Sequence, residues 1–136
     1  MTFSDFLLIN IVLSAIMTGI IWLVQIVIYP SFYHAAIKEF HKHHVKSIGP
    51  IVAPLMIIEL MSMAWLLSIN QHLFLIASAM CLLVIWLSTF LIQVPIHNKI
   101  RENMNIPSVK TLVLSNWIRT IFWTVKTILL LYYATS

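Results

Sequence analysis

The sequence predicts an all-α integral membrane protein folded as an antiparallel four-helix bundle. Hydrophobic residues make up 61% of the 136 residues, and Asp, Glu, Lys and Arg together make up 9%, whereas soluble domains carry roughly 25% charged residues. A bilayer core about 30 Å thick needs roughly 20 helical residues per crossing. Four apolar segments approach that length, at residues 6–29, 51–69, 73–94 and 109–133. We therefore expect residues 1–136 to form a single transmembrane domain.

Residues that interrupt helices separate these four segments. Proline lacks the backbone N–H that continues a helix, and Ser commonly caps one. The first segment is expected to stay in the membrane, because residues 1–5 contain no Lys or Arg of a secretion signal. The interruptions are Tyr29-Pro30 after the first helix, Gly49-Pro50 before the second, Pro95 after the third, and Asn105-Ile106-Pro107 before the fourth, for which Ser108 is the expected N-cap.

The first loop, residues 31–48, also carries a helical pattern. We expect it to form either a helix in the membrane interface or an inward extension of the second helix. The second loop, residues 70–72, is so short that the helices on either side must form a hairpin. The first-loop residues at helical spacing are His34, Ile37, His41, His44 and Ile48.

The charged residues of the loops predict the orientation. Loops rich in Lys and Arg stay in the cytoplasm, so both termini are expected on the non-cytoplasmic side of a bacterial cytoplasmic membrane. The net charge of +4 lies on short loops, so no nucleic-acid partner is expected. The cations are Lys38, Lys42 and Lys46 in the first loop and Lys99, Arg101 and Lys110 in the third.

Each predicted helix carries one polar stripe. At about 100° per residue, side chains three, four or seven positions apart share a helix face. Polar groups at membrane depth usually face a bundle interior or a water-filled cavity. We therefore expect the stripes to converge on a pocket in the cytoplasmic half of the bundle. They comprise Asn10, Ser14, Thr18 and Gln25; Glu59 and Ser62; Thr89, Gln93 and His97; and Asn116, Arg119, Trp123 and Lys126.

The charged residues inside the spans need partners. Glu59 is the one acidic residue of the predicted spans, and Arg119 is the nearest cation in expected depth. Since each would otherwise be an uncompensated charge, we expect them to pair, directly or through water, in a site or as a purely structural salt bridge. Lys126 either faces the pocket or extends its ammonium group to the outer surface.

Two runs of residues resemble the paired signatures of the anthrone-oxygenase-like family of small four-helix membrane proteins. The runs are residues 88–99 (STFLIQVPIHNK) and residues 116–120 (NWIRT). His97-Asn98 stands where an Asn-Asn type of pair is commoner in that family. The resemblance implies oxygenation of a lipophilic aromatic compound without a recognised metal or flavin. Such chemistry needs a base to form a carbanion and a cation to stabilise the enolate.

The polar pocket therefore has several interpretations. In an oxidoreductase acting on a lipophilic small molecule, Glu59, His97 and Arg119 are the expected catalytic residues. The alternatives are a transporter or ligand-binding protein, with Glu59 as a proton-coupled carboxylate, and an accessory subunit of a membrane complex. Residues expected to bind ligand are Gln25, Gln93, Asn116 and Trp123.

No cofactor is predicted, and the expected partners are the bilayer, a lipophilic small molecule and a second copy of the chain. Ala15 and Gly19 form a small-residue face that favours a homo-oligomer. A metal site at His41, His44 and His97 is an alternative, since imidazole binds transition metals, but the lysines near the first two favour a solvated role. Haem needs two facing histidines, and no predicted span holds a central one.

Overall fold

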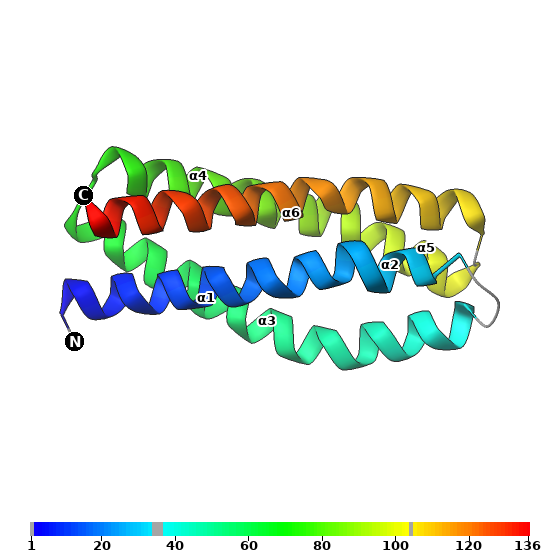
Figure 1. Ribbon diagram of the computed structural model, residues 1–136. Helices are drawn as coiled ribbons and strands as arrows, with labels where there is room; N and C mark the ends of the chain where they lie inside the picture. The colour runs from blue at the N-terminus through cyan, green and yellow to red at the C-terminus, as the bar shows by residue number, and fades with distance from the viewer. Residues whose placement is uncertain (1, 34–36, 104) are drawn as a thin grey trace.

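The computed structural model describes residues 2–33, 37–103 and 105–136, and the regular structure of these residues is helical. Four helical rods lie side by side, with both termini at one end (Figure 1). The predicted all-α four-helix bundle is confirmed. The rods are α1 (Phe3–Leu23), η1 (Val24–Ile28) and α2 (Tyr29–Ser31); α3 (Ile37–Ile69); α4 (Leu73–Ser88), η2 (Thr89–Gln93) and α5 (Val94–Glu102); and α6 (Ile106–Thr135), where η marks a π-helical segment.

Side-chain oxygens and nitrogens cap three of the rods at their N-terminal ends. Thr2 and Asp5 form a reciprocal capping box at α1, and His72 caps α4. Asn105 caps α6, because its Oδ1 accepts the backbone N–H of Ser108 at 2.8 Å. The prediction of Ser108 as N-cap is therefore wrong by three residues.

The prolines do not end the first and third rods where the sequence predicted. Each rod widens into a π turn whose last hydrogen bond comes from the residue just before the proline. The N–H of Tyr29 reaches the carbonyl of Val24, and the N–H of Val94 reaches that of Thr89. The first rod therefore continues through Pro30 to Ser31, and the third continues to Glu102.

The second rod is longer than predicted. α3 starts at Ile37 and contains both Pro50 and Pro54. Of the two alternatives for the first loop, the structure shows the inward extension of the second helix for residues 37–48. His34 and the rest of residues 34–36 lie outside the described residues.

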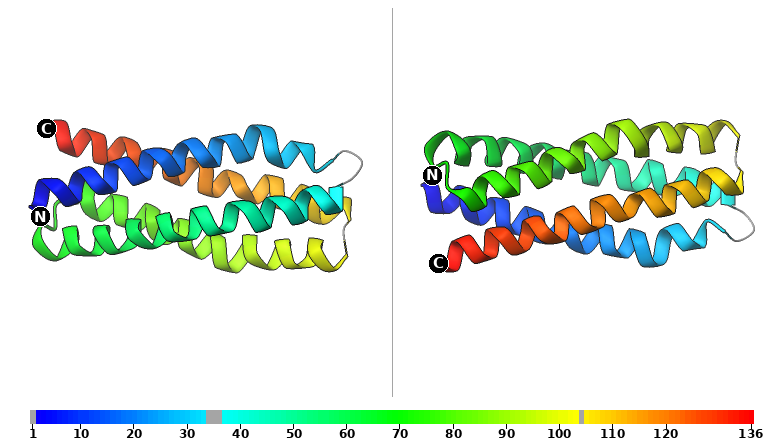
Figure 2. Two further views of the ribbon diagram at one scale, coloured as in Figure 1. Left: turned by 90° about the horizontal axis from the view of Figure 1, so that it is seen from below. Right: turned by 90° about the horizontal axis from the view of Figure 1, so that it is seen from above.

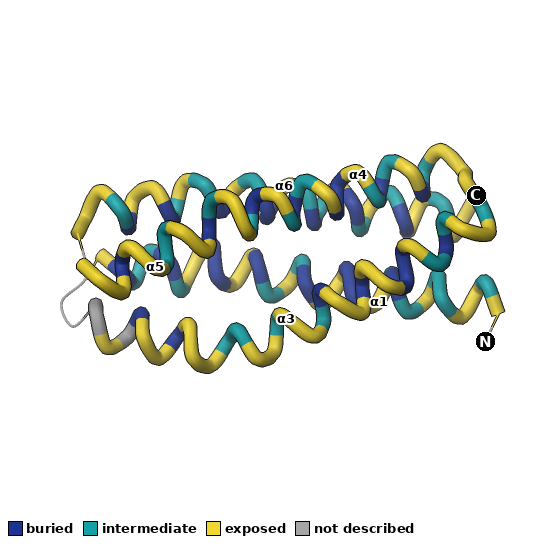
Figure 3. The backbone as a smooth tube through the Cα atoms, turned by 180° about the vertical axis from the view of Figure 1, so that it is seen from behind, coloured by how far each residue is buried: buried dark blue, intermediate teal, exposed yellow. Residues whose placement is uncertain are grey.

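The bundle presents apolar side chains outward along its length. In Figure 3 the buried residues line the sides of the rods that face one another, and exposed residues cover the outside. Figure 2 shows the same four rods from two opposite sides. Three stretches are long and apolar enough to cross a membrane, namely Phe3–Ser31, His41–Ile69 and Leu73–Glu102. The fourth rod, α6, carries three cations and is not among them.

Candidate functional site

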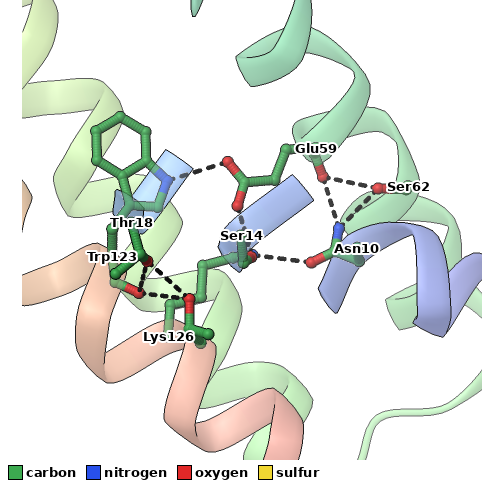
Figure 4. A network of polar contacts seen from close by, with 8 residues as sticks. Asn10, Ser14, Thr18, Glu59, Ser62, Trp123 and Lys126 are labelled. Carbon is green, nitrogen blue, oxygen red and sulfur yellow. Dashed lines mark hydrogen bonds and ion pairs between the residues drawn. The ribbon is translucent and has the colours of Figure 1, made fainter. Parts of the chain in front are cut away.

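The buried polar residues form two separate groups. The first, which we call the ion-pair cluster, consists of Asn10, Ser14, Glu59, Ser62, Trp123 and Lys126 and is drawn in Figure 4. Lys126 Nζ donates to Glu59 Oε1 at 2.8 Å, and both side chains are fully buried. Trp123 Nε1 donates to the other oxygen of Glu59 at 3.2 Å. The carboxylate is thus neutralised and held on both sides.

Helix α1 completes the ion-pair cluster from the opposite side. Ser14 Oγ donates to Glu59 Oε1 at 2.7 Å, and Asn10 Oδ1 accepts from Lys126 Nζ at 2.8 Å. The amide nitrogen of Asn10 donates to Ser62 Oγ at 2.7 Å. A buried ion pair keeps its desolvation cost low only when further hydrogen bonds satisfy both groups, and this one meets that condition.

The predicted pairing of Glu59 with Arg119 is wrong, because Lys126 occupies that place. Glu59 lies ten residues before the end of α3, and Lys126 lies nine residues before the end of α6 (69 − 59 and 135 − 126). These two ends lie at the same end of the bundle (Figure 1). Arg119 precedes Lys126 by seven residues in α6, so it lies about 10 Å farther from that end of the bundle at 1.5 Å per residue. The alternative in which Lys126 extends outward is also wrong.

Arg119 is the centre of the second polar group. Its Nε donates to Asn116 Oδ1 at 3.0 Å, and Nη2 donates to the same oxygen. Asn116 in turn donates to Gln25 Oε1 at 2.8 Å, and Gln25 donates to the carbonyl of Val113. Gln25 and Asn116 therefore orient the guanidinium group. Among the described residues no carboxylate pairs with Arg119, although 91% of its surface is buried (9% exposed).

A chain of hydrogen bonds leads away from Arg119 through three ring side chains. Nη2 of Arg119 lies 3.5 Å from Tyr29 Oη, which lies 3.1 Å from His97 Nε2. The other ring nitrogen of His97, Nδ1, lies 2.9 Å from His41 Nε2. These residues come from α6, α2, α5 and α3, so all four rods contribute.

A cavity of about 250 Å³ lies beside this group, and we call it the Arg119 cavity. Its walls are mainly apolar, and five of its lining residues carry polar side chains. The polar lining is Tyr29, His44, His97, Asn98 and Arg119; the apolar lining includes Met17, Ile21, Val24, Ile48, Val52 and Trp123. Such a space can hold an apolar body and direct one oxygen at the guanidinium group.

Known proteins add no assignment to this geometry. No protein-family model, curated protein or solved structure gives a significant match to this chain. The resemblance to the anthrone-oxygenase-like family stays a prediction from its two motifs.

The structure divides the sequence-predicted site residues between different places. His97, Arg119 and Trp123 line the Arg119 cavity, and Gln25 and Asn116 lie behind Arg119. Glu59 belongs to the ion-pair cluster and does not line the cavity. Gln93 also lies outside the cavity lining; its Nε2 donates to Ser115 Oγ at 2.9 Å, and its buried Oε1 has no hydrogen-bond partner in the described part of the chain.

The histidines named as metal candidates do come together. His41 and His97 share a hydrogen bond, and His44 lines the same cavity as His97. Within residues 2–33, 37–103 and 105–136, no group of three His, Cys, Asp or Glu side chains has an arrangement that could hold a metal ion.

Sequence reasoning missed Tyr29 as a residue of the site and gave Asn10 no partner. The sequence predicts Tyr29 only as a helix end, yet Tyr29 lies four positions after Gln25 and so continues the polar stripe of the first helix. Asn10 was placed on that stripe without a partner, although it and Lys126 are both near the end of the bundle that carries the termini. The four-residue spacing from Gln25 to Tyr29, and the closeness of Asn10 and Lys126 to the two ends of the sequence, indicate both placements.

Proposed function

We propose that this chain is an integral membrane protein that binds a lipophilic small molecule carrying one acidic or enolisable oxygen. The observation that carries the proposal is the contrast between the two buried cations of α6. Lys126 is neutralised by Glu59, whereas Arg119 has no carboxylate among the described residues and borders an apolar cavity. A buried charge without a counter-charge is unfavourable. An anionic oxygen from a ligand would supply that counter-charge.

The membrane setting includes α6 as a fourth crossing in this proposal. Its cations Arg119 and Lys126 are buried against the other rods, while its outward positions are apolar and exposed, including Leu114, Ile121 and Ile128. Lipid would therefore meet hydrocarbon along α6, and the charges would stay inside the bundle. Four crossings place the cationic loops together in the cytoplasm and both termini on the opposite side.

The cavity chemistry selects the class of ligand. An apolar lining favours a compact hydrocarbon or aromatic body, and Arg119 with Tyr29 offers hydrogen-bond donors to one oxygen. Hydrogen bonds to a charged group contribute about 1.5–3 kcal/mol. The oxygen should therefore change affinity by about 10-fold to 100-fold, at about 1.4 kcal/mol per factor of ten.

Binding of 2-naphthol and of 2-methylnaphthalene, which has a methyl group in place of the hydroxyl, tests this proposal. The purified chain in lipid nanodiscs is compared with empty nanodiscs by equilibrium dialysis. We expect 2-naphthol to bind at least 10-fold more tightly, and Arg119→Gln to abolish that preference while 2-methylnaphthalene binding is unchanged. Lys110→Gln is the matched control, since Lys110 is an exposed cation on the same helix. Equal affinity for the two compounds in the unmodified chain would overturn the proposal.

Enzymatic proton abstraction from the ligand is a second candidate, supported by the contacts between Arg119, Tyr29 and His97. An oxygenase of the type that the motifs suggest would use Arg119 to stabilise an enolate. His97 takes the role of base in this proposal, because Glu59 is committed to Lys126. The same commitment makes Glu59 a poor proton-coupled carboxylate for a transporter.

A further inference from the structure

A second cavity lies on the other side of His97. It measures about 200 Å³ and is lined by His41, Lys42, Lys46, His97, Asn98 and Arg101, together with Val45. Lys42, Lys46, Asn98 and Arg101 are exposed, so this cavity reaches the surface at the loop end of the bundle. We call it the basic mouth. His97, Asn98 and Val45 line both cavities and so lie between them.

The hydrogen-bonded chain of ring side chains leads from one cavity to the other. Tyr29 lines the Arg119 cavity, His97 lines both cavities, and His41 lines the basic mouth. The two links measure 3.1 Å and 2.9 Å, within the range over which hydrogen-bonded protons transfer. No hydrogen bond among the described residues engages the other ring nitrogen of His41, Nδ1, and His41 lines the basic mouth.

We propose that Tyr29, His97 and His41 form a proton relay that connects the Arg119 cavity to the basic mouth. The relay rests on the proposed function, since its proton comes from the acidic oxygen of the bound ligand. Imidazole suits this role because one ring nitrogen can accept a proton while the other donates one. Both links can run in either direction, since the roles of the ring nitrogens depend on the tautomer.

The proton transfers balance without an oxidant or reductant. The ligand O–H bond breaks and its proton moves to Tyr29 Oη, whose own proton moves to His97 Nε2. The Nδ1 proton of His97 moves to Nε2 of His41, and the Nδ1 proton of His41 passes to water. The net result is a ligand anion beside Arg119 and one hydronium ion at the basic mouth. Departure of the ligand as the neutral acid runs the same steps backward.

The charged neighbours favour passage of the proton over its storage. The cations Arg119 and Arg101 face the relay from α6 and α5, and the imidazole of His44 faces it from α3. Lys42 and Lys46 line the basic mouth. A proton held on His97 or His41 would lie beside like charges, which is unfavourable at low dielectric. The proton should therefore continue to water.

Stopped-flow mixing of nanodisc-embedded protein with 2-naphthol tests the relay. A pH indicator in weak buffer reports proton release, and naphtholate absorbance reports ionisation of the bound ligand. We expect the unmodified chain to release one proton per naphthol bound. His41→Ala should bind naphthol within about 3-fold of the unmodified chain but release the proton at least 10-fold more slowly, and added imidazole should restore the rate.

Two further variants locate the path. Tyr29→Phe should also slow proton release at least 10-fold, and imidazole should not restore it, because the missing hydroxyl lies on the far side of His97. His43→Ala is the matched control and should match the unmodified chain, since His43 is an exposed neighbour of the basic mouth that does not line it.

The outcomes separate the relay from the proposed function. Fast proton release from His41→Ala with naphthol binding intact would overturn the relay alone, as would a slow rate that imidazole does not restore. Failure of the unmodified chain to bind naphthol in preference to 2-methylnaphthalene would overturn the proposed function and the relay together.

Discussion

Arg119 and Lys126 are buried cations on the same helix, two turns apart, with different kinds of partner. Lys126 meets a carboxylate and two neutral oxygens from α1. Arg119 meets only the neutral oxygens of Asn116 and Tyr29 among the described residues. We infer that Lys126 stabilises the fold and that Arg119 binds the ligand, because only Arg119 lacks a carboxylate partner among the described residues.

This division predicts opposite behaviour for the two cations in unfolding experiments. Lys126→Met should destabilise the bundle by about 3–5 kcal/mol, because it leaves the Glu59 carboxylate buried and unpaired. The double variant Glu59→Gln with Lys126→Met should recover most of that loss, since both charges are then removed. Unfolding in mixed micelles of increasing denaturing detergent measures the free energies.

Lys110→Met supplies the control for that comparison, since Lys110 is exposed on the same helix. A Lys126→Met chain as stable as this control would show that the ion-pair cluster contributes nothing to the fold.

The two π turns are the elements that set the positions of the site residues. A π turn contains one residue more than an α turn, so every later side chain moves round the helix axis by about 100°. η1 precedes Tyr29 and η2 precedes His97, which are joined by a hydrogen bond. Both turns also lie just before a proline, whose ring and missing N–H disfavour a regular α turn there.

Pro95→Ala tests the role of η2. The new backbone N–H can bond to the carbonyl of Leu91, so the π turn can relax to a regular α turn and rotate His97 out of the cavity wall. We expect 2-naphthol binding to weaken at least 5-fold, although Pro95 lines neither cavity. Equilibrium dialysis measures the affinity.

The control for this change is Leu91→Ala, an exposed position on the same rod. Unchanged naphthol affinity in Pro95→Ala would mean that packing alone, without the proline, holds the π turn.

The two ends of the whole bundle differ in charge. Lys42, Lys46, Lys99, Arg101 and Lys110 lie at or near the end opposite the termini, where the loop between α5 and α6 also lies (Figure 1). Positive loops are retained in the cytoplasm. The relay would then release its proton on the cytoplasmic side.

Cysteine labelling in intact cells tests this orientation. In a Cys81→Ala background, a cysteine introduced at Gln71 or Ser136 should react with a membrane-impermeant maleimide added outside. A cysteine introduced at Asn103 should react only after the cells are permeabilised. All three positions are exposed in the bundle, so differences in labelling report the side of the membrane. The reverse pattern would contradict the proposed topology.

The spacing of apolar and polar residues was enough to predict the class of fold and most of the inward faces. Asn116, Arg119 and Trp123 were placed on one inward stripe of the fourth helix, and all three are buried. This succeeded because helical geometry relates residues three, four and seven apart whatever the tertiary structure is. The predicted helix ends failed at Pro30 and Pro95, because a π turn can absorb a proline that would otherwise interrupt a helix.

Which cation meets Glu59 was decided only by the tertiary structure. In the predicted helices, Glu59 lies ten residues before the end at residue 69. Lys126 lies seven residues and Arg119 fourteen residues before the end at residue 133, so neither cation clearly lies at the same level of the bundle as Glu59. The actual end of α6 at Thr135 moves these distances to nine and sixteen (135 − 126 and 135 − 119), which selects Lys126. A sequence determines the direction of a side chain from its helix through local geometry. The position along the bundle axis at which side chains of two helices meet depends on caps, π turns and packing along the whole bundle. That position determined which cation pairs with Glu59 and which one has no carboxylate partner among the described residues.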